Sequence, residues 1–319
     1  MPLEIIRHDI TQLAVDAIVN AANQQLRQGG GVCGAIFEQA GVKQMSEATQ
    51  GLGPIDVGQA VITPGFQLPA KHVIHAVGPI WQGGKSGEEP LLREAYTNSL
   101  KLATDHGLQS IAFPLISSGI YGYPKAEALS VAISAISDCL LKNDLMVYLV
   151  VYDKTAYQLS EKLQQRVESY IDEHYVVQRS RQQWERIQTT GYEAPAKDLI
   201  LEALITPDPG FSETLFQLID ASGKTDPEVY KKANLDRKLF SKIRNNPGYR
   251  PSKTTALALA IALELSLSQT EDLLARAGYA LSPSDYRDLI VKFFISQNNY
   301  NIFELNQVLF AYDQPLLGV

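Results

Sequence analysis

Two short runs of small residues are the parts of this sequence best suited to bind a negatively charged ligand. The first, Gly29–Gly31, follows the β-rich segment DAIVNA and precedes the helical pattern VCGAIFEQAG. Glycine leaves the backbone open to a ligand, and the N–H groups at a helix start attract anions. The spacing GxxxxGK[ST] and the spacing GxGxxG are both missing, which excludes a P-loop and a Rossmann fingerprint. A phosphate or sugar-phosphate site remains, with a plain glycine-rich turn as the alternative.

The second run, Ser117–Gly122, follows the apolar segment SIAFPLI and precedes another helical pattern that has Pro124 near its first turn. Its backbone N–H groups and hydroxyls could bind phosphate, and Tyr121 offers a flat surface for a sugar. In open α/β sheets, ligands bind beyond the carboxyl ends of the strands. Together the two runs predict a site that holds a diphosphate between them.

Two further residues could bind a nucleobase. Asp9 follows the first β-rich segment, where its carboxylate could accept a hydrogen bond from a base amino group, or equally cap the turn over TQL. Tyr152 ends the segment LMVYLVVYD and could stack on a base, although an aromatic side chain at a strand end is more often part of the core. Both alternatives stay open for each residue.

The elements that must position these residues alternate between strand and helix, which predicts an α/β layered domain. The predicted strands are LEIIR, DAIVNA, QAVITPG, KHVIHAVG, SIAFPLI and LMVYLVVYD. The predicted helices are Val32–Ala40, Leu91–His106, Lys125–Leu141 and Thr155–Tyr175. The last three strands are nearly continuous apolar runs, as expected when helices cover both faces of a sheet.

Composition predicts a soluble protein of two domains. The chain has 319 residues, 45% of them hydrophobic and 20% charged, with a net charge of −7. This charge argues against a general polyanion binder but leaves room for a local basic face. Two cysteines fit a reducing compartment, and no signal-peptide core or run of 18 apolar residues occurs, so we expect a cytoplasmic protein.

The second half is predicted to be a separate all-α domain at 197–319, joined to a first domain at 1–175 by a polar linker at 176–196. Its predicted helices are Lys197–Leu204, Ser212–Ser222, Asp226–Ala233, Asp236–Asn245, Lys253–Leu265, Ser268–Ala277, Ser284–Gln297 and Ile302–Phe310. Strand signals are nearly absent from this part of the sequence.

One interval of this half is basic. Nine basic residues there face three acidic ones, Asp226, Glu228 and Asp236; they are Lys224, Lys231, Lys232, Arg237, Lys238, Lys242, Arg244, Arg250 and Lys253. The helix order resembles helix-turn-helix domains of the Cro/phage-repressor type, although the usual glycine after the first helix is missing. The resemblance implies that Arg237, Lys238 and Ser241 face base edges. It also implies that Lys242 and Arg244 reach phosphates. The alternative is a solvated helical face in a protein adaptor.

The first half resembles the macrodomain family, whose members bind ADP-ribose. The matching motifs are DIT at Asp9–Thr11, VDAIVNAAN at Val15–Asn23, GGGVCGAI at Gly29–Ile36, LPAKHVIHAVGP at Leu68–Pro79 and FPLISSGIYGYP at Phe113–Pro124. The resemblance implies a three-layer α/β/α fold with a mixed sheet, and ADP-ribose lying across the strand ends. It implies neither a cofactor nor a metal. His72, His75 and His106 do not have the spacing of a metal-ligand cluster.

The resemblance also implies roles for individual residues. Asp9 would bind the adenine amino group, Ile10 would offer a backbone N–H, and Tyr152 would pack against adenine. The diphosphate would be surrounded by Ser117, Ser118, Gly119, Ile120 and Val32. The distal ribose would be enclosed by Asn23, Gly29, Gly30, Gly31 and Tyr121, and Ala22 would be a further ligand contact. Asn20 would brace the first loop, and Asn23, Asn20 and Gly30 would take part in catalysis.

Two positions depart from a hydrolysing branch of the family. That branch usually has an acid at the position of Cys33 and often a histidine at that of Phe37. A thiol is a poor substitute for a carboxylate that orients water, so Cys33 is more easily explained as a small structural residue. An ADP-ribosyl hydrolase whose water is positioned partly by the substrate phosphate is one expectation. A non-catalytic reader of ADP-ribose is the other, and the partners would be ADP-ribosylated macromolecules, DNA or a protein.

Overall fold

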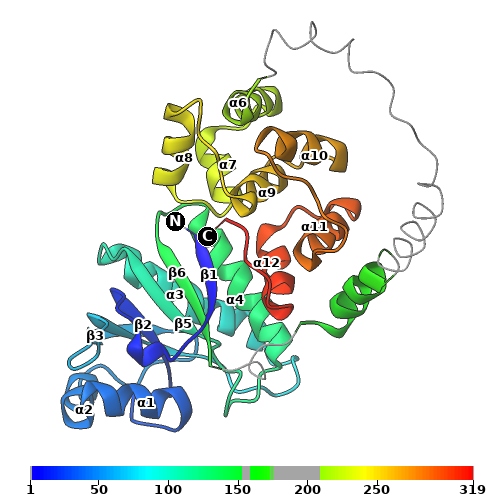
Figure 1. Ribbon diagram of the computed structural model, residues 1–319. Helices are drawn as coiled ribbons and strands as arrows, with labels where there is room; N and C mark the ends of the chain where they lie inside the picture. Colours follow the sequence, from blue (N-terminus) through cyan, green and yellow to red (C-terminus); the bar gives the residue numbers. More distant parts are fainter. Residues whose placement is uncertain (1, 153–158, 173, 175–208, 319) are drawn as a thin grey trace, which may run out of the picture. The chain divides into compact units, whose positions relative to one another are not determined.

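The computed structural model describes residues 2–152, 159–172, 174 and 209–318 (Figure 1). The chain divides into two compact units, Met1–Ser160 and Glu161–Gly318. The predicted linker at 176–196 and the predicted helix Lys197–Leu204 lie outside the described residues. None of the described helices has the length and apolar character needed to cross a membrane.

The first unit contains one mixed sheet of six strands. The strands are β1 (Leu3–Arg7), β2 (Ala17–Ala22), β3 (Ala60–Pro64), β4 (His72–Val77), β5 (Ser110–Pro114) and β6 (Met146–Val151). They lie in the order β1-β6-β5-β2-β4-β3, and all neighbours pair in parallel except β3, which is antiparallel to β4. All six predicted strands and the mixed sheet are confirmed.

Helices cover both faces of this sheet, which gives the predicted three-layer α/β/α fold (Figure 1). They are α1 (Gly31–Ala40), α2 (Val42–Gln50), α3 (Glu88–Asp105) and α4 (Lys125–Leu140). Successive strand residues point to opposite faces, and β5 shows which helices lie where. Ala112 belongs to the core that includes Phe37 of α1 and Met45 of α2, whereas the ring of its neighbour Phe113 lies 5.2 Å from that of Tyr96 in α3.

Among the described α-helices α1 to α4 of this unit, α2 alone was not predicted from the sequence. Its sequence, VKQMSEATQ, buries only Met45 and Thr49. A helix with so few buried side chains shows no apolar repeat in the sequence. Its position comes instead from contacts with α1 and β3.

The second unit is helical throughout its described residues. It contains a helix over residues 161–172, then α6 (Phe211–Ser222), α7 (Asp226–Lys232), α8 (Arg237–Asn245), α9 (Lys253–Ala262), α10 (Leu267–Arg276), α11 (Tyr286–Ser296) and α12 (Ile302–Ala311). Every residue of α9 from Thr255 to Ala262 is buried, and α9 packs against α7, α10 and α12 in the core of this unit.

The boundary between the compact units differs from the sequence expectation, which placed residues up to 175 in the first domain. The helix over 161–172 belongs to the second unit, where the Arg166 side chain donates a hydrogen bond of 2.6 Å to Gln297 and lies over the ring of Phe293. Sequence order alone groups this helix with the strand before it, because its partners come more than 120 residues later.

The segment after α12 closes the second unit. Asn306 of α12 donates a hydrogen bond of 3.0 Å to the carbonyl of Leu317 and accepts one of 2.8 Å from its N–H. Leu317 has no exposed surface, and Gly318 follows with a φ of 77°. A Cβ at Gly318 would lie 2.1 Å from the carbonyl oxygen of Ala233, so only glycine fits between this segment and the turn from α7 to α8.

Candidate ligand-binding site

A cavity of about 750 Å³ lies at the carboxyl ends of the parallel strands in the first unit. Its walls come from the segments that follow β1, β2, β4 and β5, from the end of β6, and from the first turn of α1. The predicted ligand-contact residues all line it: Asp9, Ile10, Ala22, Asn23, Gly29, Gly30, Gly31, Val32, Ser117, Ser118, Gly119, Ile120, Tyr121 and Tyr152. The structure therefore brings together two glycine-containing loops that are about ninety residues apart in the sequence. What each residue contacts in a ligand stays a prediction.

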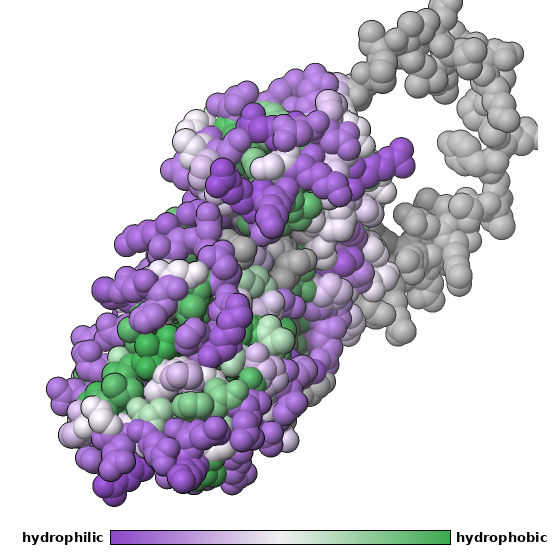
Figure 2. All heavy atoms as spheres, turned by 90° about the vertical axis from the view of Figure 1, so that its left-hand side faces the viewer, coloured by the Kyte–Doolittle hydropathy of each residue, from purple (hydrophilic) through white to green (hydrophobic). Residues whose placement is uncertain are grey.

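Large hydrophobic side chains border this cavity without being covered by protein. Ile120 is 80% exposed and Tyr152 is 79% exposed, although both are apolar enough to be buried. On the face of the protein drawn in Figure 2, hydrophobic residues lie together and are framed by hydrophilic ones. Exposed apolar groups at the rim of a concave site are typical of surfaces that a ligand covers.

The first loop, which joins β2 to α1 and contains Gly29 and Gly30, is closed by hydrogen bonds of the Asn23 side chain. Asn23 Nδ2 donates a hydrogen bond of 2.7 Å to the carbonyl of Arg27, and Asn23 Oδ1 accepts one of 3.2 Å from the N–H of the same residue. Asn23, rather than Asn20, therefore makes the hydrogen bonds that brace this loop. Beneath it, a Cβ at Gly34 would lie 2.7 Å from the Gly29 carbonyl oxygen, so α1 approaches the loop closely only because Gly34 has no side chain.

Helix α1 presents its N-terminus to the cavity without a side-chain cap. Gly30 is the N-cap residue, and the first turn contains no acidic residue. Gly30, Gly31, Val32 and Cys33 all line the cavity. Uncapped N–H groups at a helix start favour a negatively charged ligand there.

The second loop contains a hydroxyl that has no partner. Ser117 adopts a φ of 64°, an uncommon conformation for a residue with a side chain, and is only 6% exposed. Its Oγ is buried and makes no hydrogen bond to any described residue. A Cβ at Gly78 would lie 2.2 Å from this oxygen, so the glycine after β4 leaves the space that the hydroxyl occupies. A buried unpaired hydroxyl at a cavity wall is suited to bond a ligand or a water.

The third segment holds Asp9 at one end of the cavity. Asp9 Oδ1 accepts hydrogen bonds from the N–H and the hydroxyl of Thr11, at 2.9 and 2.7 Å. The carboxylate therefore caps the short 3₁₀ turn Ile10–Gln12, as one of the two sequence alternatives stated. Because both bonds end on Oδ1, the second oxygen can still accept a hydrogen bond from a base.

Asn20 does not reach the cavity. It has no exposed surface, and its Nδ2 lies 3.0 Å from Nδ1 of His75. The other ring nitrogen, Nε2, lies 2.9 Å from Oγ1 of Thr63. Burial lowers the pKa of the His75 imidazole to about 4, so the ring is neutral at pH 7. The residue predicted to be catalytic thus ties β2 to β4 and, through His75, to β3, and contacts no cavity space.

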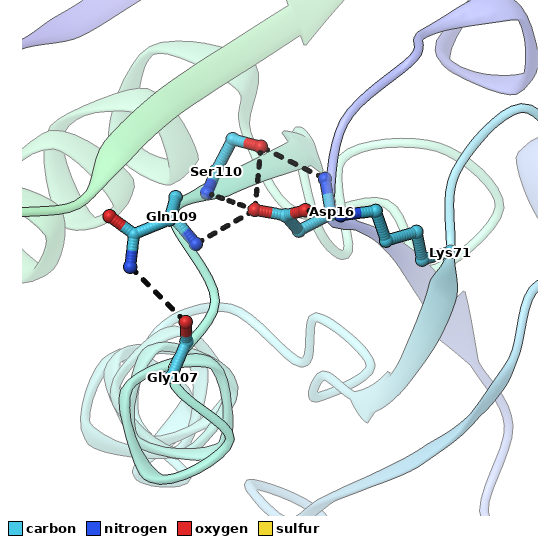
Figure 3. A network of polar contacts seen from close by, with 5 residues as sticks. All are labelled: Asp16, Lys71, Gly107, Gln109 and Ser110. Carbon is cyan, nitrogen blue, oxygen red and sulfur yellow. Dashed lines mark hydrogen bonds and ion pairs between the residues drawn. The ribbon is translucent and has the colours of Figure 1, made fainter.

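The opposite ends of the same strands are held by a polar network around Asp16 (Figure 3). Asp16 Oδ1 accepts a hydrogen bond of 2.7 Å from Lys71, and Oδ2 accepts bonds from the N–H groups of Gln109 and Ser110 at 2.8 and 3.1 Å. The Lys71 hydrogen bond, with help from the backbone N–H of Gln109, holds the pKa of the Asp16 carboxyl below its usual range. The carboxylate of Asp16, just before β2, therefore binds residues at the starts of β4 and β5.

Comparison with known proteins identifies the first unit. The Macro domain family matches residues 19–132. The O-acetyl-ADP-ribose deacetylase of Salmonella typhimurium is 49% identical over 166 residues, which cover 50% of this chain and 93% of that protein. A Macro domain-containing protein of Methanosarcina mazei is 48% identical over 154 residues, covering 48% of this chain and 82% of that protein. This chain belongs to the macrodomain family.

A solved structure gives a similar match to the macrodomain. The Oceanobacillus iheyensis macrodomain with ADP is 39% identical, covers 48% of this chain and 85% of that chain, and has a TM-score of 0.45.

Within the macrodomain of this chain, the two departures noted in the sequence have different surroundings. Cys33 lines the cavity but is only 4% exposed, and its Sγ lies 3.8 Å from the Arg27 carbonyl. Phe37 has no exposed surface, and its ring packs edge-on against His75 with a centroid distance of 6.3 Å. Both residues belong to the same hydrophobic core, but Cys33 also lines the cavity, whereas Phe37 does not.

Several cavity residues were not predicted as ligand contacts from the sequence. They include His8, Thr11, Gly78, Leu115, Ile116 and Val150. His8 directly precedes Asp9, and Gly78 directly follows β4, so a search of every residue next to a parallel strand end would have found both. No group of three His, Cys, Asp or Glu side chains able to hold a metal occurs among the residues that the structure describes.

The residues predicted to contact nucleic acid lie on α8 in the second unit. Arg237, Lys238, Ser241, Lys242 and Arg244 are all exposed. Within the turn before this helix, Asn234 adopts a φ of 55°, so an asparagine takes the left-handed conformation for which the sequence offered no glycine.

Ion pairs reduce the basic excess that the sequence predicted for this region. Glu264 accepts hydrogen bonds from Lys224 at 3.3 Å and from Lys232 at 3.1 Å, although it lies outside the basic interval of residues 224–253. Lys253 pairs with the buried Asp288 at 2.5 Å. Arg244 pairs with Asp226 and also lies 4.2 Å from the centroid of the Phe216 ring, so it is held within the unit.

Proposed function

We propose that this protein binds ADP-ribose in the macrodomain cavity and hydrolyses a bond that joins ADP-ribose to another group. The observation that carries this proposal is the meeting of two loops rich in backbone N–H groups with one carboxylate, all around a single cavity. Such a cavity suits a ligand with a diphosphate in the middle and a base at one end. The resemblance to proteins named O-acetyl-ADP-ribose deacetylase supports the choice of an ester-linked or glycosidic ADP-ribose.

In this proposal the charged part of the ligand lies between the loops. The N-terminus of α1 and the segment Ser117–Ile120 bind the diphosphate, and Asp9 Oδ2 accepts a hydrogen bond from the base amino group. Tyr152 covers the base, and Tyr121 with Gly29–Gly31 encloses the distal ribose. The only carboxylate among the described residues lining the cavity is Asp9, which would bind the far end of the ligand.

The chemistry therefore relies on the substrate as much as on the protein. A phosphate oxygen of the substrate orients a water, which attacks the acyl carbon of an ester or the anomeric carbon of a glycosidic bond. The bond from that carbon to the ribose oxygen, or to the attached group, breaks, and the leaving atom takes up the proton that the water loses. The N–H of Gly30 positions the diphosphate that supplies this oxygen. Asn23 keeps the loop in place beside the distal ribose, and Asn20 holds β2 to β4 through His75.

A turnover assay tests hydrolysis directly. The full chain is incubated separately with O-acetyl-ADP-ribose, with mono-ADP-ribosylated protein and with ADP-ribosylated DNA, and released ADP-ribose is quantified. Release from at least one substrate is the expected result. If ADP-ribose binds in calorimetry but is released from none of the three substrates, the proposed hydrolase activity is contradicted.

A non-catalytic reader is the second candidate, and the surroundings of Cys33 favour it. This residue stands where hydrolysing relatives of one branch usually have an acid, and its buried thiol lies against the backbone carbonyl of Arg27. In that case the macrodomain would sense ADP-ribose and the helical unit would transmit the signal as a regulator or adaptor.

We further propose that α8 directs the protein to a nucleic acid. Arg237, Lys238 and Arg250 are exposed and form no ion pair with any described residue. Two of these cations, Arg237 and Lys238, stand in the first turn of α8, where positive charge opposes the helix dipole. A bound phosphate backbone would offset this unfavourable placement.

The proposal for α8 is tested with the full chain and a labelled DNA duplex. Lys238→Ala should weaken a salt-dependent shift, whereas Lys232→Ala, which removes a lysine already paired with Glu264, should change it little. No shift by the unmodified chain at low salt would instead favour a protein partner.

A further inference from the structure

His8 lies at the base end of the cavity and has no role in the function proposed above. The residue before it, Arg7, pairs with Val151 in the parallel ladder of β1 and β6. The N–H of His8 then donates a hydrogen bond of 3.2 Å to the Val151 carbonyl. This places His8 level with Tyr152 at the carboxyl ends of two adjacent strands, and both residues line the cavity.

The hydrogen bond of the His8 ring determines which of its nitrogens carries the proton. Nδ1 lies 2.9 Å from the carbonyl oxygen of Asp9. A carbonyl oxygen can only accept, so Nδ1 must donate and therefore carries a hydrogen. In the neutral imidazole Nε2 is then unprotonated and acts as an acceptor.

The base end of the cavity thus offers two hydrogen-bond acceptors. One is Oδ2 of Asp9, because Oδ1 is occupied by Thr11. The other is Nε2 of His8, the residue next in the chain, whose exposed ring lines the same cavity. An exocyclic amino group has two hydrogens and can donate to both, whereas a keto oxygen at the same position would face acceptors alone.

We propose that His8 is a specificity-determining residue that selects an amino purine over a keto purine. The inference depends on the proposed binding of ADP-ribose in this cavity and adds a second contact for its base. His8 Nε2 accepts one amino hydrogen and Asp9 Oδ2 accepts the other. The site therefore prefers ADP-ribose to its hypoxanthine analogue, in which a keto oxygen replaces the amino group.

Calorimetric titration of the full chain with both ligands tests this preference. The unmodified protein should bind ADP-ribose about 25-fold more tightly than the hypoxanthine analogue, because that analogue leaves two acceptors unpaired and each net hydrogen bond contributes about fivefold. His8→Phe keeps a flat ring but removes the acceptor, and should lower this ratio about fivefold, the value of one net hydrogen bond. His8→Gln restores an acceptor oxygen and should recover part of the ratio.

His106→Phe is the matched control. His106 is also exposed, and its Nδ1 also bonds a backbone carbonyl, that of Leu102 at 2.8 Å, but it does not line the cavity. The affinity ratio of this variant should equal that of the unmodified protein. An unchanged ratio in His8→Phe would overturn the role of His8 while leaving ADP-ribose binding intact. Failure of the unmodified protein to bind either ligand would instead overturn the proposed function, and the role of His8 with it.

Discussion

Replacing Gly119 by valine should weaken ADP-ribose binding and leave the stability of the macrodomain nearly unchanged. Gly119 lines the cavity in the second loop, and a Cβ at this position would meet no protein atom within 4 Å. Its φ lies outside the left-handed region, so a side chain causes no backbone strain. The new methyl groups therefore enter open space beside the cavity, which the proposal assigns to the diphosphate.

The size of the effect follows from the contacts that would be lost. A hydrogen bond to a charged group contributes about 1.5–3 kcal/mol, so displacing one phosphate contact should raise the dissociation constant roughly 10- to 150-fold. A surface substitution without steric conflict usually changes the free energy of unfolding by no more than about 0.5 kcal/mol. Gly119→Ala should give an intermediate loss of affinity, because it adds only the Cβ.

Calorimetric titration with ADP-ribose and urea unfolding measure the two quantities. Gly51→Val is the matched control, since Gly51 also has no atom within 4 Å of a Cβ and has a φ of −95°, but it ends α2 away from the cavity. Equal affinities for the Gly119 and Gly51 variants would refute the placement of the diphosphate beside the second loop. A large loss of stability in Gly119→Val alone would show that the glycine serves the fold.

Three further outcomes are expected. Gly318→Ala should destabilise the helical unit more than Gly278→Ala in thermal unfolding. Both glycines have a φ near 80°, but only at Gly318 would the methyl group meet a backbone oxygen. Equal losses of stability would contradict the close approach of the segment around Gly318 to the α7–α8 turn. Unfolded His75 takes up a proton below its ordinary pKa of about 6.5 while the folded ring stays neutral down to about 4, so stability should fall by about 3 kcal/mol as the pH drops through this window. His75→Gln should remove that part of the pH dependence in urea titrations, and an unchanged profile would mean that the ring is not buried neutral. The pKa of the Asp16 carboxyl is lowered in the folded protein, so the stability that this carboxylate contributes is present above its unfolded pKa of about 3.9 and is lost as the pH falls through the lower folded value. Asp16→Asn should therefore be less stable than the unmodified protein at pH 6, and the difference in unfolding free energy should shrink in acid.

Local patterns in the sequence were sufficient for most of the fold. The six strands are short apolar segments between turn residues, and the two glycine-containing loops directly follow strands, so their place at one sheet edge could be predicted. Helix α2 could not be, because only Met45 and Thr49 of it are buried.

What the sequence could not supply depends on residues far apart in the chain. His8 lies beside Tyr152 because β1 pairs in parallel with β6, which comes about 140 residues later in the sequence. Lys224 is neutralised by Glu264, 40 residues away, so counting charges within an interval overstated the basic face. Asn20 was expected to brace the first loop from its place in a motif, yet its amide bonds His75 on a neighbouring strand.

The Asp16 network and the cavity occupy opposite ends of β2, whose six residues span about 20 Å at the usual rise of a strand. Changes at such a separation usually combine additively. Resistance to acid or heat could thus be engineered around Lys71 and Ser110 without retuning affinity. Conversely, a library of loop variants could be screened for new nucleotide ligands on a scaffold whose folding reserve stays constant.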